Sequence, residues 1–410
     1  MRRLFTLLAI LLILSMLPLA LFGCNAEEKP SGSKTTGTTP GKNDNEQPVL
    51  EGTEYILKDN LNSIKINGRY KVTNIGLACD NVGSGIEFQG VMKGKVYLTL
   101  TALRIVWGIS ESVYYTVYVD GVRQDERYEA FCGKEDIVLT LADFGDSEGK
   151  HHIRVVKQSE ARYTMAQFTK ITMDGSFSER PADREYFVEF VGSDLICGLG
   201  NYNGTPDQTA ALAQTSEYED GTQSMSFITA EHLKADCSIL GVSGMGVEGA
   251  WTAPLNAPLY YKTNSYYRNK NELYDFESGR TPDLIVLNIG KNDGNIPVEN
   301  RPSDAAYKVA IMEFLTFLKQ THGDDVKIIW TYDIPEDDPT TLDDESNVCR
   351  IDVAREAIEL LGGEDSNIYI CQLTTNRLGG QKHTDKAGHV QAAQELLDFI
   401  REKGILPVGQ

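Results

Sequence analysis

Residue types that together can carry out acyl transfer follow successive apolar runs in the second half of the chain. Each of them comes after a run of β-forming residues, in a short polar or glycine-rich stretch. A nucleophile, convergent N–H donors and a late histidine make up an acyl-transfer site. The candidates are a hydroxyl, a carboxylate, a glycine turn, an amide and an imidazole: Ser193, Asp194, Gly244, Asn292 and His383.

A parallel sheet is the element that would position these residues. Strand signals alternate with helical stretches from residue 184 onward, which is typical of a sheet covered by helices on both faces. We therefore predict a three-layer α/β/α domain over residues 184–404. The carboxyl ends of its strands are where such sheets bind ligands. The five predicted strands are Phe187–Val191, Ser238–Val242, Leu284–Ile289, Val326–Thr331 and Ile368–Cys371.

Helices with one apolar face connect these strands. Ser303 can cap a helix in which five apolar residues share one face, namely Tyr307, Ile311, Phe314, Leu315 and Leu318. Residues 225–235 predict a shorter helix. The last helix is indicated by Val390, Ala393, Leu397 and Ile400, which lie at helical spacing.

The first half of the chain predicts a separate all-β domain over residues 52–180. Short alternating runs are separated by turn residues, and two of the runs end at Asp120-Gly121 and Asp174-Gly175. Asp-Gly favours a tight hairpin turn. We expect an antiparallel β-sandwich, in the form of a jelly roll. Its expected role is a structural partner of the second domain, with an accessory sugar contact as the alternative.

The N-terminus has the pattern of a targeting segment. Basic residues precede an apolar stretch, and residues 1–24 end at Cys24, in the manner of a bacterial lipoprotein signal peptide. Residues 25–51 are polar and rich in Gly, Thr and Lys, which predicts a disordered tether. We expect Cys24 to be lipidated, and the protein to lie outside the cytoplasm on the bacterial cell membrane, or to be secreted.

Charge and cysteine content limit the classes of partner. The formal net charge is −20, from 59 acidic and 39 basic residues, which disfavours binding to nucleic acid. The seven cysteines are scattered without a CxxC pair or zinc spacing. The sequence therefore predicts no metal site.

The second domain resembles the SGNH (GDSL-type) hydrolases, which have a flavodoxin-like fold. The order of the two domains is similar to that of bacterial acetyl-xylan and carbohydrate esterases of the second carbohydrate-esterase family. The resemblance runs from about residue 60 to the C-terminus. It rests on Gly83–Phe88, Tyr118–Gly121, Gly149–Lys157 with Glu160, Val242–Val247, Asn288–Gly294 and His383–His389.

This resemblance implies specific roles for the candidate residues. Gly244 and Asn292 would donate to the oxyanion, and His383 would be the general base that activates a serine. Family members remove acetyl groups from plant-polysaccharide sugars without a cofactor. The implied partner is therefore an acetylated polysaccharide or oligosaccharide.

The nucleophile block departs from the family pattern. The family has Gly-Asp-Ser, whereas this chain has Gly192-Ser193-Asp194, so that Asp194 aligns with the nucleophile. Three interpretations follow. A changed turn lets Ser193 reach His383, or Asp194 itself acts as nucleophile or base, or the domain is an inactive enzyme that keeps a carbohydrate-binding cleft. The first and third stay open from the residues alone, and the resemblance favours a hydrolase.

Two further features concern orientation and substrate binding. Where the SGNH pattern has an aspartate three residues before the histidine, this chain has Gly380. The resemblance to the carbohydrate esterases implies that a backbone carbonyl orients His383 instead. Asp385 is expected at the start of the last helix. Trp251 and Trp330 are the predicted sugar contacts, since aromatic rings beside a cleft can stack on sugars.

Overall fold

The computed structural model describes residues 50–105, 110–209, 215–248, 256–263, 272–294, 296, 300–336 and 350–407. The predicted signal peptide, Cys24 and nearly all of the predicted tether lie outside these residues. Leu50–Gln410 forms one compact unit, so the boundary between the two domains stays a prediction. Within the described ranges, none of the helices combines the length and the apolar character that a membrane span requires.

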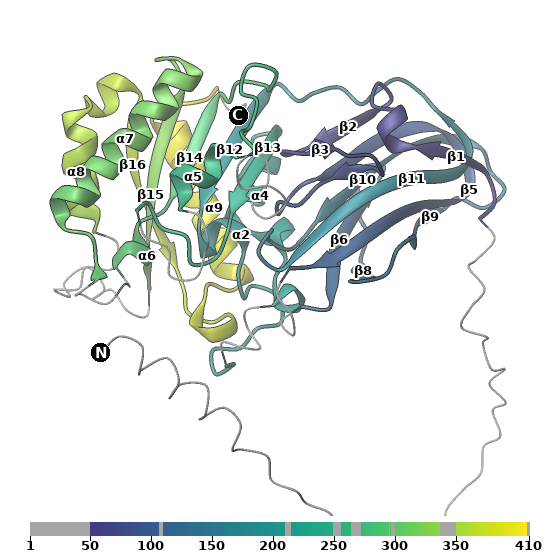
Figure 1. The fold of residues 1–410 in the computed structure, drawn as a ribbon, viewed down its shortest axis with the longest axis horizontal. Helices are drawn as coiled ribbons and strands as arrows, with labels where there is room; N and C mark the ends of the chain where they lie inside the picture. The colour runs from purple at the N-terminus through teal and green to yellow at the C-terminus, as the bar shows by residue number, and fades with distance from the viewer. Residues whose placement is uncertain are drawn as a thin grey trace, which may run out of the picture. The chain divides into compact units, whose positions relative to one another are not determined.

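Eleven strands of the first half pair into one antiparallel system (Figure 1). The long strand β5 is central, because it pairs with four others, β2, β9, β10 and β11. Its core-facing residues include Ile86, Phe88 and Leu98, all fully buried. The strands are β1 (Thr53–Ile56), β2 (Ile64–Asn67), β3 (Lys71–Val72), β4 (Leu77–Ala78), β5 (Gly85–Arg104), β6 (Ser112–Val119), β7 (Val122–Arg123), β8 (Tyr128–Phe131), β9 (Ile137–Asp143), β10 (Gly149–Lys157) and β11 (Thr164–Phe177).

The two Asp-Gly pairs behave differently. Asp120 and Gly121 have φ values of 51° and 81° and join β6 to β7 in a tight hairpin, which confirms the predicted turn. Asp174-Gly175 does not end its strand, because β11 continues to Phe177. The register of β11 against β5 shifts between Met173 and Asp174, so this pair forms an irregularity within a paired strand.

The second half contains a five-stranded parallel sheet, as predicted (Figure 1). Its spatial order is β13-β12-β14-β15-β16, which is the flavodoxin-like order. β13 lies on one side of β12, and β14 with the later strands lies on the other side, so the strand order switches here. A crevice for ligands is expected at this point, between the carboxyl ends of β12 and β14. The strands are β12 (Tyr186–Gly192), β13 (Ala235–Gly241), β14 (Leu284–Asn288), β15 (Lys327–Pro335) and β16 (Ile368–Thr375).

Helices cover both faces of this sheet, since two separate apolar cores contain its residues. One core joins the sheet to α2, α4 and α9, and the other joins it to α5, α7 and α8. The described α-helices are α2 (Asp194–Cys197), α4 (Met225–His232), α5 (Ala257–Tyr261), α6 (Lys291–Gly294), α7 (Asp304–His322), α8 (Ile351–Leu360) and α9 (Lys386–Glu402). Short 3-10 turns occur at Leu57–Asp59, Ser216–Tyr218, Gly221–Gln223, Gly363–Ser366 and Gly380–Lys382.

The predicted helix faces are largely confirmed. Ser303 caps α7 by accepting a hydrogen bond from the Ala306 N–H at 3.2 Å, and the five predicted apolar residues of that helix are buried. The last helix is found as α9, in which Ala393, Leu397 and Ile400 are buried and Val390 is half exposed. At this end of the helix the buried face includes His389, the residue before Val390.

Candidate functional site

Ser193 lies where β12 ends and α2 begins. It is 5 % exposed, and its hydroxyl does not cap the short helix. Its Oγ instead accepts two hydrogen bonds, from Asn292 Nδ2 at 2.7 Å and from the Gly244 N–H at 3.1 Å. The three residues follow β12, β14 and β13, so the carboxyl edge of the sheet brings them together as the sequence indicates.

Local backbone geometry makes this convergence feasible. Gly192 lies close to β14, and a Cβ there would stand 2.2 Å from the Asn288 carbonyl oxygen, so only glycine fits. Gly244 has a φ of 80°, in the left-handed region that favours glycine. Asn292 lies in α6 directly after β14, and its Nδ2 also donates to the Met245 carbonyl at 3.2 Å. This second bond fixes the orientation of the amide.

Asp194 shares one donor with Ser193. It is the first residue of α2, and its Oδ1 accepts from the Gly244 N–H at 3.2 Å. Neighbouring residues usually point apart, but Ser193 has φ −105° and ψ −137°, outside regular helix and strand values. This unusual turn directs the Ser193 hydroxyl and the Asp194 carboxylate toward the same backbone N–H.

His383 is oriented by a backbone carbonyl, in the way that the resemblance implies. It is partly buried, and its Nδ1 lies 2.8 Å from the Gly380 carbonyl oxygen. With Nδ1–H donating to that oxygen, Nε2 carries the lone pair that a base requires. Among the described residues, no hydrogen bond joins His383 to Ser193 or Asp194. Asp385 caps α9 by accepting from the Gly388 N–H at 2.9 Å, as expected.

His389 is a second, fully buried histidine behind this site. Its Nδ1 accepts a hydrogen bond from the Met225 N–H at 3.1 Å, while Nε2 has no hydrogen-bond partner in the described part of the chain. Burial lowers the pKa of His389 from 6.5 to about 4. The side chain is therefore a neutral packing residue of α9, with a role in stability.

The neutral state of His389 predicts a loss of stability in acid. The unfolded chain binds a proton at His389 below pH 6.5 and the folded chain only near pH 4, so stability falls as pH drops through this window. The loss amounts to about 3 kcal/mol at pH 4. It is measured as the difference between the unfolding free energies of wild type and His389→Asn, in which Oδ1 can replace Nδ1 as acceptor. A difference that stays constant from pH 7 to pH 4 would contradict this account.

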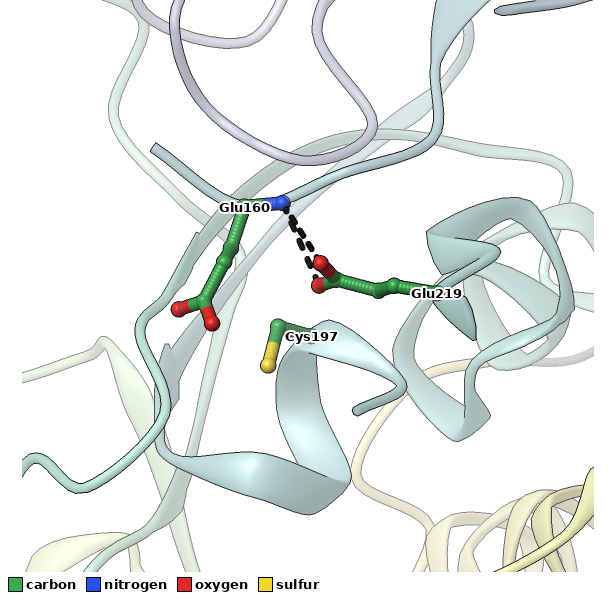
Figure 2. Close-up of side chains that lie close together, drawn as sticks. All are labelled: Glu160, Cys197 and Glu219. Atoms are coloured by element: carbon green, nitrogen blue, oxygen red, sulfur yellow. Dashed lines mark hydrogen bonds between the residues drawn. The ribbon is translucent and has the colours of Figure 1, made fainter. Parts of the chain in front are cut away.

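Glu160, Cys197 and Glu219 form a fully buried cluster next to the site (Figure 2). Their ligand atoms lie within 4.8 Å of one another, so the three could in principle hold a metal ion. Both carboxylates are already engaged, however. Glu160 binds Ser243, and Glu219 accepts from the Glu160 N–H. Burial raises the pKa of Glu160 to about 7, and burial together with the nearby Glu160 raises the pKa of Glu219.

Glu160 was not predicted as a site residue. In the sequence analysis it appears only as the residue into which the run Gly149–Lys157 continues. Its position beside Ser243 comes from the packing of that loop against the turn after β13. The sequence pointed to Glu160 in one way only, because this run is one of the motifs on which the family resemblance rests.

The predicted sugar contact at Trp330 is wrong. Trp330 is fully buried in the core between the parallel sheet and the α7–α8 layer. The error arises because β15 continues to Pro335, so position 330 lies inside the strand and not at its end. Tyr260 and Tyr261 are also buried. Trp251 lies outside the described residues, so its predicted role stays a prediction.

No protein-family model and no curated protein matches the chain. Solved structures do match its fold. An acetyl xylan esterase from Butyrivibrio proteoclasticus is 23% identical, with a TM-score of 0.71 over 88% of this chain and 100% of that one. A family two carbohydrate esterase from Clostridium thermocellum, solved in complex with cellohexaose, is 22% identical, with a TM-score of 0.70 over 84% and 100%.

A third similar structure is described as a carbohydrate esterase whose active site displays divergent catalytic and non-catalytic binding functions. It is 18% identical, with a TM-score of 0.62 over 86% of this chain and 99% of that one. The predicted structural resemblance to family two carbohydrate esterases is thus confirmed. At these identities the likeness establishes the fold.

Proposed function

We propose that the protein is a carbohydrate esterase that removes acetyl groups from acetylated plant polysaccharide, with Ser193 as nucleophile and His383 as general base. The observation that carries this proposal is the convergence of the Gly244 N–H and Asn292 Nδ2 on Ser193 Oγ. Two oriented donors next to a buried hydroxyl suit acyl transfer, since negative charge develops on the oxygen of the attacked carbonyl.

The proposed reaction proceeds through an acetyl-serine. Ser193 Oγ attacks the acetyl carbonyl carbon while His383 Nε2 accepts the Oγ proton. The carbonyl electron pair moves to oxygen, and Gly244 and Asn292 then donate to that oxyanion. When the intermediate collapses, the carbon–oxygen bond to the sugar breaks, and the departing sugar oxygen takes the proton from His383. Water attacks the acetyl-serine by the same steps and releases acetate.

Substrate binding must bring His383 to Ser193, because the two are not hydrogen bonded among the described residues. Catalytic hydrogen bonds are often long without substrate and shorten in the substrate complex. Asp194 limits the reaction in this scheme, because its carboxylate accepts from the Gly244 N–H that the oxyanion needs. A neutral residue at position 194 should therefore favour oxyanion binding.

The remaining sequence expectations belong to this proposal. Lipidation at Cys24 would hold the protein on the outer face of the bacterial cytoplasmic membrane, where polymeric substrates are available. The jelly-roll form of the β-sandwich and the sugar contact at Trp251 are further parts of the same proposal. Retention of the lipid can be checked by the mass of the mature N-terminal peptide.

The test is acetate release combined with labelling of the nucleophile. Wild type should release acetate from acetylated xylan and from an aryl acetate, and a fluorophosphonate should label Ser193, as read from the mass of the tryptic peptide. Ser193→Ala should abolish both signals, whereas the matched variant Asp194→Ala should keep both. Hydrolysis by only the exchanged variant, Ser193→Asp with Asp194→Ser, would contradict the proposal.

A second candidate function is carbohydrate binding without turnover. The observation that favours it is the hydrogen bond that the Asp194 carboxylate accepts from the Gly244 N–H. The expected oxyanion would need the same N–H. This function predicts no acetate release above background but measurable binding of an oligosaccharide such as cellohexaose. Calorimetric titration of wild type and of Trp251→Ala would then show binding that depends on Trp251.

A further inference from the structure

A loop between two strands of the first half reaches the turn that carries the Gly244 donor. This loop comprises residues 158–163, between β10 and β11. Glu160 accepts two hydrogen bonds from Ser243, one from its N–H to Oε2 and one from its hydroxyl to Oε1, both at 2.5 Å. Ser243 directly precedes Gly244, the proposed oxyanion donor. Glu160 therefore binds both the N–H and the hydroxyl of the residue next to that donor.

Arg162 contacts Ser243 at its hydroxyl and at its carbonyl, and this carbonyl belongs to the next peptide group, Ser243–Gly244. Its Nη1 donates to Ser243 Oγ at 2.9 Å and lies 3.5 Å from the Ser243 carbonyl oxygen. The Ser243 carbonyl and the Gly244 N–H belong to one planar peptide unit and point in opposite directions. Contacts that fix the carbonyl therefore also aim the N–H, which points at Ser193 Oγ.

Glu160 is itself held firmly in the interior. Its N–H donates to both carboxylate oxygens of Glu219, at 3.2 and 3.1 Å (Figure 2). Lys157 Nζ donates to the Glu160 carbonyl at 3.3 Å, and the side chains of all three residues are fully buried. Because this backbone is fixed on both sides, the Glu160 carboxylate has little freedom to leave Ser243.

We propose that Glu160 is a positioning residue that aims the Gly244 N–H at the reacting oxygen through Ser243. The β-sandwich would thus be part of the working site, since it supplies the loop that sets an oxyanion donor. This inference rests on the proposed esterase function for its kinetic consequence. Its structural consequence, an ordered Ser243–Gly244 peptide, can be measured whether or not the protein hydrolyses an ester.

The kinetic test is a double-mutant cycle of Glu160→Gln and Ser243→Ala. An amide at position 160 has one oxygen and one NH2 group, so it cannot accept from both the N–H and the hydroxyl of Ser243. The Gly244 N–H is then no longer held in the direction of the reacting oxygen. Loss of an oxyanion donor typically lowers kcat by about 100-fold or more. A donor that is present but wrongly oriented should lower kcat by about tenfold or more. KM for an aryl acetate should stay within about twofold. The two substitutions should be non-additive, because they remove one interaction. Glu148→Gln, on an exposed loop, is the matched control.

The second measurement is hydrogen exchange of the peptide that contains residues 243–245. Exchange there should be faster in Glu160→Gln and unchanged in Glu148→Gln, and Ser243→Ala gives the same comparison if Glu160→Gln fails to fold. Unchanged exchange, or a changed exchange with additive kinetic effects, would overturn the inference. If wild type hydrolyses no ester and exchange still responds to Glu160→Gln, the esterase proposal fails and the positioning of the turn stands.

Discussion

Replacement of His383 by alanine should lower kcat for acetyl-ester hydrolysis by about a thousandfold, because a positioned general base contributes roughly 10²–10⁴. His383 acts on the proton of Ser193 only as the bond to carbon forms. KM should therefore change little, since substrate binding in the ground state does not use the imidazole. The measurement is steady-state hydrolysis of an aryl acetate, with acetate release from acetylated xylan as the second substrate.

The matched control for this prediction is His232→Ala. His232 is an exposed histidine at the end of α4, where its Nδ1 contacts the Ile228 carbonyl. This variant should keep the wild-type kcat. If His383→Ala also kept it, another group would have to take the Ser193 proton, and Asp194 would be the first to test. Similar melting temperatures for the two variants would show that the loss comes from the missing base.

Replacement of Trp330 by alanine should reduce the free energy of unfolding by about 3–5 kcal/mol, the usual cost of deleting a buried aromatic side chain. Trp330 is fully buried and is paired with Leu287 on one side and Ile370 on the other. Its neighbours in the sheet cannot close the resulting cavity. Denaturant unfolding monitored by circular dichroism measures the loss.

The substitution also separates a core role from a role in sugar binding. Trp330→Phe should cost less, since most of the buried volume remains. Both variants should bind oligosaccharide and turn over ester like wild type when assayed at a temperature where they are folded. A weakened oligosaccharide affinity with unchanged stability would contradict the core assignment.

Much of the arrangement followed from local sequence patterns. Residues after successive apolar runs had to meet at one edge of a parallel sheet, because side chains that follow parallel strands share that edge. This argument brought Ser193, Gly244 and Asn292 together correctly. The capping of α7 by Ser303 and the Asp120-Gly121 hairpin were equally local, since each depends on a few adjacent residues. Orientation of His383 by a backbone carbonyl was implied by the family resemblance alone, and the structure identifies that carbonyl as the one of Gly380.

The tertiary structure decided what depends on contacts between distant segments. Neither periodicity nor spacing indicates that the turn at Ser193 directs its hydroxyl and the Asp194 carboxylate to one N–H. The burial of Trp330 depends on the helices that cover β15, and the register of α9 exposes Val390 while burying His389. Glu160 meets Ser243 across 83 residues of sequence, from a loop of the other sheet. The types of residue in the site were therefore set by the sequence, and their directions by packing, because a side chain's environment is fixed only when remote segments close around it.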